Sequence, residues 1–233
     1  MTFREVINEV LIRLRETPIT SDWSGAINDS TTVSDYYKVI GALVNDSKRS
    51  IESYHDWQIL RETVDITTVA STKNYNLSSG QEFKILDVVN NATGNELVQV
   101  SRAYLNRERY PTASTGEPHY YGFNGADSSN NLKVDLSPVP TTAQTLSFDI
   151  VKPQDDLSLA ATVLKIPNKP VILGAWARAI SERGEDGGTQ SSLMAQETGE
   201  AIKQAIMLDS GNTEYESDWF VKENYSHGTV NFR

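Results

Sequence analysis

Residues 33–57 read VSDYYKVIGALVNDSKRSIESYHDW, and this stretch decides how the rest of the chain can fold. Its apolar side chains recur at steps of three, four and seven residues, which predicts one long helix with a single apolar face. Those positions are Tyr36, Ile40, Leu43, Val44, Ile51 and Tyr54. Thr32 is the expected N-cap, and polar side chains such as Lys48 and Glu52 are expected to cover the remaining surface. A helix of this length, roughly 37 Å, needs partners on at least two sides.

Three further helices are predicted, one before this stretch and two near the other end of the chain. Thr2 and Glu5 have the spacing of a capping box, which predicts a helix over residues 2–16. The two later helices are expected over residues 168–184 and 190–208. Each helix has one apolar side, so packing the four apolar stripes together predicts an antiparallel four-helix bundle built from both ends of the chain.

The middle of the chain changes to an alternating pattern of apolar and polar residues. Six to eight short strands are predicted between residues 62 and 153, and residues 102–110 are expected to form a short helix or an irregular crossing. This density of turn residues predicts an inserted antiparallel β-barrel or sandwich. The predicted α+β architecture comprises a helical bundle domain (1–61 and 165–209), an inserted β domain (62–164) and an extended C-terminal arm (210–233).

The composition is acidic and free of cysteine. The 31 Asp and Glu residues outnumber the 21 Lys and Arg residues, which gives a formal charge of −10 at pH 7. Such a chain gains nothing from counterion release on DNA, so specific DNA binding is not expected. The lack of cysteine excludes disulfides and thiolate metal sites. No apolar run approaches the roughly 20 residues of a membrane helix, and the start lacks a signal-peptide core, so we expect no association with membranes.

The sequence carries no pattern that is typical of an enzyme. The three histidines, His55, His119 and His227, have no acidic or histidine neighbour at the spacing of metal ligands. Glu182 and Glu185 are three residues apart, as in di-metal bundle proteins, but no second helix repeats the pattern with a histidine. Phosphate-binding glycine loops, nucleophile elbows and zinc-protease helix motifs are absent from the sequence. We therefore predict no catalytic residue, no metal site and no cofactor.

The C-terminal arm, residues 210–233, has no clear period but is rich in aromatic side chains. Burying a large apolar side chain is worth about 1.5–3 kcal/mol, so the arm is expected to dock on a partner or to fold back on its own bundle. The candidate interface residues are Tyr215, Trp219, Phe220, Tyr225 and Phe232.

Taken in order, several stretches resemble the head-to-tail adaptor (connector) proteins of short-tailed bacteriophages, the family of tail tubular protein A. These stretches are FREVINEVLIRLRE (3–16), YHDWQILRET (54–63), GEPHYYGFNG (116–125), LKVDLSPVP (132–140), FDIVKPQDDLS (148–158) and KPVILGAWARAISERGEDGG (169–188). No single stretch is specific, and the resemblance depends on their number and order. It extends to about residue 209, so the arm is the part least like the family.

The resemblance implies a structural virion protein, made in the host cytoplasm and located at the head–tail junction. Such adaptors form a ring, usually of twelve copies, beneath the portal of the filled head, and the tail nozzle or tube attaches on the other side. DNA passes through the ring without specific binding. A ring needs different surfaces on the two sides of each subunit, and a two-part subunit with an aromatic arm offers them. The arm would then bind the portal or a neighbouring subunit.

Two other interpretations remain open at the level of sequence. One is a tail-completion or stopper protein at a different position in the virion. The other is a carbohydrate-binding module, because the inserted sheet carries Tyr104, Tyr110, Tyr120 and Tyr121, and aromatic rings can stack on sugars. Two adjacent tyrosines in a strand can also lie one in the buried face of the sheet and one at its edge. In that case no exposed aromatic surface would remain for a sugar.

Overall fold

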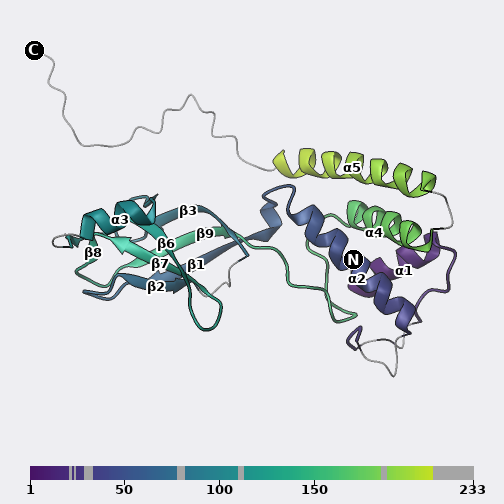
Figure 1. Ribbon diagram of the computed structural model, residues 1–233, viewed down its shortest axis with the longest axis horizontal. Helices are drawn as coiled ribbons and strands as arrows, with labels where there is room; N and C mark the ends of the chain where they lie inside the picture. Colours follow the sequence, from purple (N-terminus) through teal and green to yellow (C-terminus); the bar gives the residue numbers. More distant parts are fainter. Residues whose placement is uncertain are drawn as a thin grey trace, which may run out of the picture.

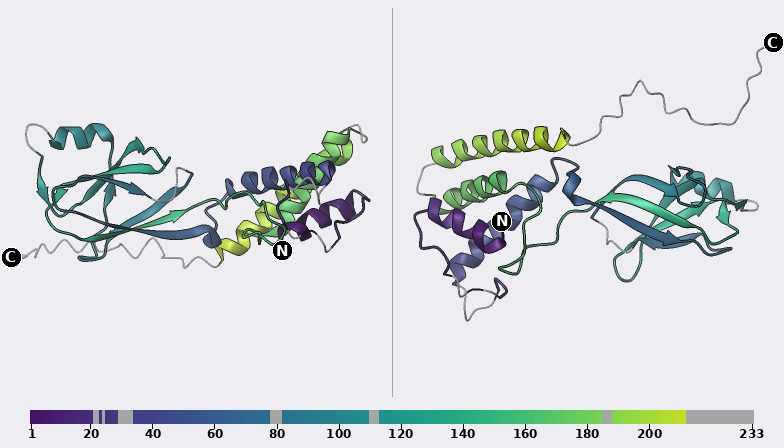
Figure 2. Two further views of the ribbon diagram at one scale, coloured as in Figure 1. Left: turned by 90° about the horizontal axis from the view of Figure 1, so that it is seen from below. Right: turned by 180° about the vertical axis from the view of Figure 1, so that it is seen from behind.

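The computed structural model describes residues 1–20, 23, 25–28, 34–77, 82–109, 113–184 and 188–211. Across these residues, Figures 1 and 2 show a helical part at one end of an elongated molecule and a β part at the other. The helices are α1 (Phe3–Arg13), α2 (Asp35–Glu52), α3 (Arg102–Arg109), α4 (Asn168–Arg183) and α5 (Thr189–Ser210), with a 3₁₀ turn, η1 (Gln58–Leu60), after α2. The strands are β1 (Arg61–Thr67), β2 (Asn74–Leu77), β3 (Lys84–Asn90), β4 (Val98–Gln99), β5 (Thr115–Gly116), β6 (Tyr120–Ala126), β7 (Leu132–Ser137), β8 (Val139–Pro140) and β9 (Thr145–Val151).

The helical part has one apolar core to which both ends of the chain contribute. Its fully buried side chains include Phe3 of α1, Val44 of α2 and Val171 of α4. The loop after α1 packs on the same core, since the ring of Trp23 lies edge-on to Phe3 with 6.2 Å between ring centroids. The two ends of the chain therefore share an interior, although the β part separates them in sequence.

The predicted four-helix bundle is wrong. Helix α4 lies in the middle, packed on α1 and α2 on one side and on α5 on the other (Figure 1). Helix α5 makes its extensive contacts with α4, and a groove separates it from α2. The reason is the face of α5 that looks toward α2, which carries Ser191, Ala195 and Gly199. Side chains this small cannot fill the space that a fourth wall of a bundle would need.

The long helix α2 also differs from the prediction at both ends and on one face. It begins after Ser34, whose hydroxyl accepts from the backbone N–H of Tyr37, so Ser34 is the N-cap and Thr32 lies outside the described residues. It ends at Glu52, before Tyr54, whose side chain is 64% exposed instead of buried. The predicted polar face is partly buried, because a later segment of the chain covers it.

The β part holds two larger sheets that share a second apolar core. Strands β1, β9 and β3 form an antiparallel sheet in that order, and β2, β7, β6 and β4 form the other. The alternation predicted for β9 is present, with Leu146, Phe148 and Ile150 buried in this core. The prediction of a wholly antiparallel β domain is wrong, because β4 pairs with β6 and β5 with β8 in parallel.

Helix α3 lies against β6 and β7, so the chain forms a helix where the sequence left a helix or an irregular crossing open. Gly122 of β6 permits this close approach. A Cβ atom at this position would lie 2.7 Å from a methyl group of Leu105 and 2.8 Å from the carbonyl oxygen of Val100. We infer that a larger side chain at Gly122 would push α3 away from the sheet.

The capping box at the start of α1 is confirmed. The Thr2 hydroxyl accepts from the backbone N–H of Glu5 at 3.4 Å, and the Glu5 carboxylate accepts from the Thr2 backbone N–H at 2.8 Å. Replacing Thr2 with Ala is expected to lower the free energy of unfolding by about 1 kcal/mol, because the backbone N–H of Glu5 loses its acceptor, the Thr2 hydroxyl. Urea unfolding measures this loss, and Thr2→Ser is the control that keeps the hydroxyl. Equal stability of the two variants would contradict the assignment.

A second prediction concerns Glu117, whose carboxylate holds the hairpin loop between β3 and β4. It accepts from the Thr93 hydroxyl at 2.6 Å and from the Asn95 side-chain amide at 3.1 Å, and these bonds lower the pKa of Glu117. A carboxylate with a lowered folded-state pKa contributes stability that is present above its unfolded pKa and is lost as the pH falls through the folded value. Glu117→Gln is therefore expected to destabilise at pH 7, with a smaller effect at pH 3. Urea unfolding at both pH values checks this, with Glu197→Gln on the exposed surface of α5 as the control; an unchanged effect at pH 3 would contradict it.

Candidate assembly surfaces

The five candidate interface residues predicted from the sequence, Tyr215, Trp219, Phe220, Tyr225 and Phe232, lie outside the described residues. Their role therefore stays a prediction. The structure does describe the point from which this segment starts, the last turn of α5 at Ser210 and Gly211.

A polar contact fixes that starting point to the junction between the two parts of the molecule. The carboxylate of Asp209 accepts from the backbone N–H of Gln58 at 3.2 Å, and its oxygen lies 3.0 Å from Nε2 of His55. The imidazole of His55 in turn lies edge-on to the indole of Trp57, which is fully buried. The end of α5 is thus tied to the turn where the chain leaves α2 and enters β1. Spacing along the sequence could not reveal this carboxylate, because 154 residues separate it from His55.

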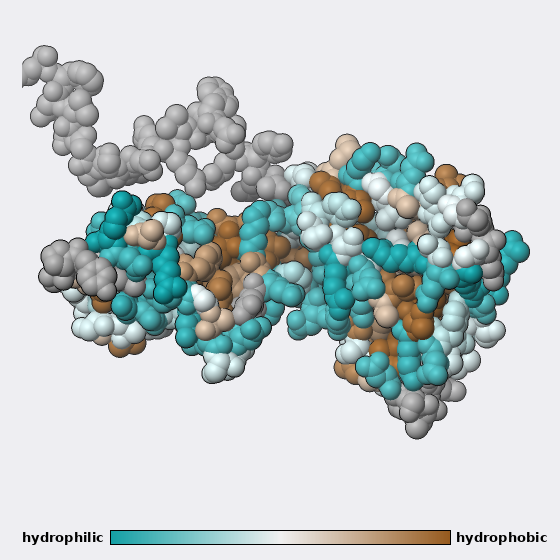
Figure 3. All heavy atoms as spheres, in the orientation of Figure 1, coloured by the Kyte–Doolittle hydropathy of each residue, from teal (hydrophilic) through white to brown (hydrophobic). Residues whose placement is uncertain are grey.

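The end of α5 also exposes apolar side chains. Met207 and Leu208 are each 75% exposed, and they are adjacent in the last turn of α5. Figure 3 shows further apolar surface over both parts of the molecule. Single exposed apolar residues are ordinary, but two together beside the start of an aromatic segment favour a contact surface.

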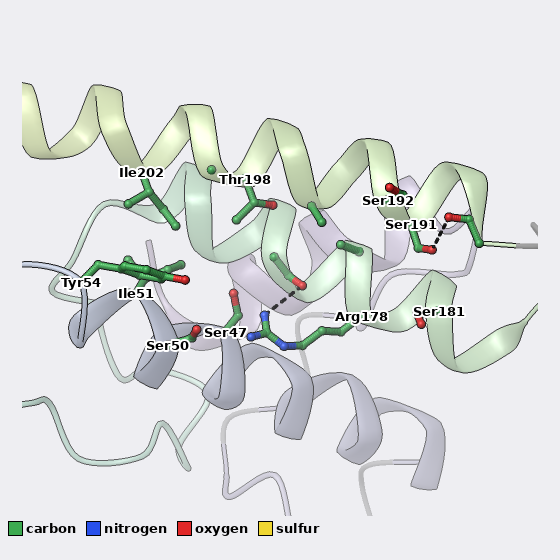
Figure 4. A pocket seen from close by; sticks show the side chains of 15 residues that line it. Ser47, Ser50, Ile51, Tyr54, Arg178, Ser181, Ser191, Ser192, Thr198 and Ile202 are labelled. Carbon is green, nitrogen blue, oxygen red and sulfur yellow. Dashed lines mark hydrogen bonds between the residues drawn. The ribbon is translucent and has the colours of Figure 1, made fainter.

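A groove of about 460 Å³ runs between α2, α4 and α5 (Figure 4). Its walls are mostly small residues. The lining residues are Ser47, Ser50, Ile51, Tyr54, Gly174, Ala177, Arg178, Ser181, Gly188, Ser191, Ser192, Ala195, Thr198, Gly199 and Ile202. In Figure 4, Tyr54, Ile51 and Ile202 lie together at one end, and the Ser181, Ser191 and Ser192 side chains lie at the other. The groove is therefore apolar at the end where α5 finishes and polar at the end where α5 begins.

One cation lies between these two ends. The Arg178 guanidinium donates to the carbonyl oxygen of Gly174 at 3.2 Å, and it forms no ion pair with any carboxylate among the described residues. A half-buried guanidinium keeps several N–H donors that a carbonyl cannot satisfy. The groove thus offers a positive charge to an occupant.

The predicted polar face of α2 is an interface between the helical part and the segment that follows β9. Lys48 and Glu52 form an ion pair at 3.2 Å, and their side chains are 0% and 2% exposed. Both also bind the backbone of Gln154, since the Lys48 ammonium donates to its carbonyl oxygen and a Glu52 oxygen accepts from its N–H at 3.2 Å. Nearby, Asn45 exchanges two hydrogen bonds with the backbone of Leu157, at 3.0 and 2.9 Å. These bonds clamp the chain leaving the β part onto α2.

Burial of the ion pair changes the acid–base behaviour of Glu52. Removal from water raises the pKa of Glu52, whereas the charge of the adjacent Lys48 ammonium lowers it. The direction of the net shift is upward, because desolvation is the larger of these effects. The pair therefore has a structural role as a clamp whose two charges depend on each other.

The tyrosines considered for sugar binding do not form an open platform among the residues that the structure describes. Tyr121 is buried in the core of the β part, and Tyr110 lies outside the described residues. The rings of Tyr104 and Tyr120 lie edge-to-face with centroids 5.4 Å apart, and the guanidinium of Arg107 lies 5.9 Å from the centre of the Tyr104 ring. These two rings are thus engaged with each other and with a cation, which disfavours the carbohydrate-binding interpretation.

The described part of the chain has neither a metal-binding cluster nor a membrane-spanning helix. No group of three or more His, Asp or Glu side chains is arranged there to hold a metal ion. No helix in the same residues is both long enough and apolar enough to cross a membrane.

Comparison with known proteins gives a family for the chain. The model of the SU10 adaptor protein family matches residues 1–218, and no curated protein matches the chain. The match covers the helical part, the β part and the start of the C-terminal segment, and it agrees with the resemblance to phage head-to-tail adaptors. The chain belongs to the SU10 adaptor protein family and is a structural adaptor protein of a bacteriophage.

Proposed function

We propose that this chain is a head-to-tail adaptor that forms a ring beneath the portal, joins the DNA-filled head to the tail and continues the DNA channel. The observation that carries the proposal is the family match over residues 1–218. The two-part subunit supports it, since a ring subunit must present different surfaces to its two neighbours and further surfaces to the proteins above and below.

Within this proposal the parts of the chain have separate tasks. The helical unit (1–61 and 165–209) and the β unit (62–164) act as the body of the ring. The arm, residues 210–233, binds the portal or a neighbouring subunit through its aromatic residues, and the tail nozzle or tube protein attaches to the opposite side. Twelve copies are expected from the family resemblance. The role is structural, with no reaction catalysed.

The acidic composition supports a channel that DNA passes without binding. The formal charge of −10 at pH 7 repels phosphates, and the 31 carboxylates outnumber the 21 lysines and arginines that could release counterions from DNA. An adaptor of this kind would guide DNA and not retain it.

Copy number and position in the virion test the proposal against a stopper or another tail protein. The number of copies per particle, measured by quantitative mass spectrometry relative to the portal protein, is expected to equal the number of portal subunits. Cross-linking of intact virions is expected to join the chain to both the portal and a tail protein. A different ratio, or cross-links to tail proteins alone, would place the chain elsewhere in the particle.

A further inference from the structure

We propose that the groove between α2, α4 and α5 is the docking site of the chain's own C-terminal segment, and that residues 214–220 occupy it in the free subunit. Docking in the free subunit does not depend on the proposed function. One added step does rest on it: binding to the portal would release the segment from the groove. Three independent features of the groove and the segment lead to this proposal: shape, charge and reach.

The shape of the groove suits large side chains from an occupant. On α5 its wall consists of Ser192, Ala195 and Gly199, which recur at steps of three and four residues and so lie on one face. A Cβ atom added to Gly199 would have no heavy atom within 4 Å, so there is open space in front of this helix. On the other side, Tyr54 is 64% exposed although it lies beside Ile51 and Ile202 (Figure 4). Ile51 and Ile202 are already buried, so a large aromatic ring placed here would cover the exposed surface of Tyr54.

The charge of the groove matches the sequence of the segment. Residues 214–220 read EYESDWF and so combine three carboxylates with three aromatic residues. The groove supplies apolar surface at one end and the guanidinium of Arg178, without a carboxylate partner in the described residues, in the middle. Arg178 can bind a carboxylate with two parallel hydrogen bonds, and an aromatic residue can fill the apolar end beside it.

The segment is long enough to fold back to this position. Ile202 lies nine positions before Gly211, which is about 14 Å along α5, and Tyr215 lies four positions after Gly211, which extended chain covers in roughly 14 Å. Thr198, thirteen positions before Gly211, lies about 20 Å along the helix. Asp218 can reach roughly 24 Å, which leaves a few ångströms for the reversal of the chain. Because Thr198 and the guanidinium of Arg178 both lie close to Gly174, Asp218 and Arg178 can meet.

The order of residues also agrees with this direction. The segment leaves α5 at the apolar end of the groove, where its first aromatic residue, Tyr215, would meet Ile202 and Tyr54. The acidic residue Asp218 follows and would meet Arg178 farther along. A segment from a neighbouring copy or from another protein could also fit the groove, and the experiment separates these occupants from the chain's own segment.

The chain has no cysteine, so a pair of introduced cysteines can test the contact in the full-length protein. Gly199→Cys places a thiol in the open space of the groove, about 18 Å along α5 from Gly211, and Ser217→Cys places one in the segment, within about 20 Å of extended chain, without removing an aromatic or acidic residue. We expect this pair to form a disulfide within one chain, at a rate independent of protein concentration, because tethering gives a high effective concentration. The readout is the fraction of oxidised monomer against time, measured by mass spectrometry.

The matched control moves the first thiol by one residue. Glu200→Cys with Ser217→Cys has the same tether, but Glu200 lies away from the groove and lines a different depression of α5. We expect it to oxidise at least tenfold more slowly. Equal rates for the two pairs would show that the segment has no preference for the groove, and disulfide-linked dimers would show that it docks on another copy; either result overturns the proposal.

Two further substitutions test the chemistry of the contact. In the Gly199→Cys, Ser217→Cys chain, Ala195→Leu fills the groove and Arg178→Gln removes its charge, and each is expected to slow oxidation severalfold. Lys203→Gln removes a cation from the exposed surface of α5 and is expected to leave the rate unchanged. No effect of either groove substitution would overturn the proposed contacts. These measurements use the free subunit. A negative result would therefore overturn docking of the segment in the groove but not portal binding, and a failure to bind the portal would overturn the adaptor role but not the disulfide result.

Discussion

Deletion of residues 212–233 is expected to abolish binding of the chain to the portal while the subunit keeps its fold. The deleted segment carries all five candidate interface residues, and aromatic side chains are the usual anchors of protein interfaces. Two such anchors, at about 2 kcal/mol each, correspond to a loss of roughly 1,000-fold in affinity. Every buried residue of the described cores lies before residue 212, so the subunit should keep its fold and lose only the free energy of the contacts between residues 214–220 and the groove.

Binding to the portal protein by surface plasmon resonance measures the effect, and urea unfolding of the truncated chain checks the fold. A finer variant replaces Trp219 and Phe220 with Ala, and its control replaces the polar residues Ser226 and Thr229 with Ala in the same segment. The aromatic variant is expected to lose most of the affinity and the control to keep it. Full binding by the truncated chain would contradict the role given to the arm.

Replacing Lys48 with Met is expected to give the largest loss of stability among single substitutions in the polar clamp, about 3–5 kcal/mol in the free energy of unfolding. The substitution leaves the Glu52 carboxylate buried without its ammonium partner, and the carbonyl oxygen of Gln154 also loses its donor. The penalty comes from the isolated charge and not from lost packing, because Met has nearly the length of Lys.

Two comparisons make this prediction specific. The double variant Lys48→Met, Glu52→Leu removes both charges and is expected to recover much of the loss. Arg49→Met, one residue away, breaks an exposed ion pair with Asp156 and is expected to cost less than about 1 kcal/mol. Urea unfolding of the three variants gives the values, and equal losses for Lys48→Met and Arg49→Met would contradict the burial argument.

The pH dependence of the Lys48→Met variant follows from the pKa of Glu52. Burial already raises this pKa, and the loss of the ammonium raises it further. A carboxyl group whose folded pKa lies above its unfolded pKa takes up a proton on folding between these two values, so the variant regains stability as the pH falls through that range. The difference in unfolding free energy between the variant and the natural chain should therefore be larger at pH 7 than at pH 4.5.

The sequence correctly predicts those helix ends that depend on residues close together in the chain. The capping box of Thr2 and Glu5 places the start of α1, and Gly184, with its left-handed φ of 67°, ends α4 as predicted. Both depend on a few consecutive residues, so no distant contact can override them.

The errors occur where distant segments meet. The sequence predicts Lys48 and Glu52 on the exposed face of α2, because polar side chains are usually exposed, yet a segment about 100 residues later supplies their partner at Gln154, 106 residues after Lys48. In the same way, the sequence predicts one buried apolar side for the last helix, but Leu193 and Leu208 of that helix are 53% and 75% exposed. Their exposure follows from the position of α5, which packs mainly on α4 and leaves much of its surface outside the core.

The candidate surfaces were only partly predictable for the same reason. The aromatic residues of the arm are evident in the sequence, but the groove requires three helices from opposite ends of the chain to be placed together. The small residues of α5 indicate a groove only weakly, because Ser, Ala and Gly on one helix face also allow close packing against another helix. Arg178 gives none, because a single arginine in an amphipathic helix predicts only an exposed charge.

The mass of the complex formed with the portal protein of the same phage tests the central claim most directly. Native mass spectrometry of the mixture is expected to give one closed complex with one copy of the chain for each portal subunit, twelve on a twelve-subunit portal. A portal ring that keeps its own mass in the presence of excess chain would contradict the assignment of this protein as the head-to-tail adaptor.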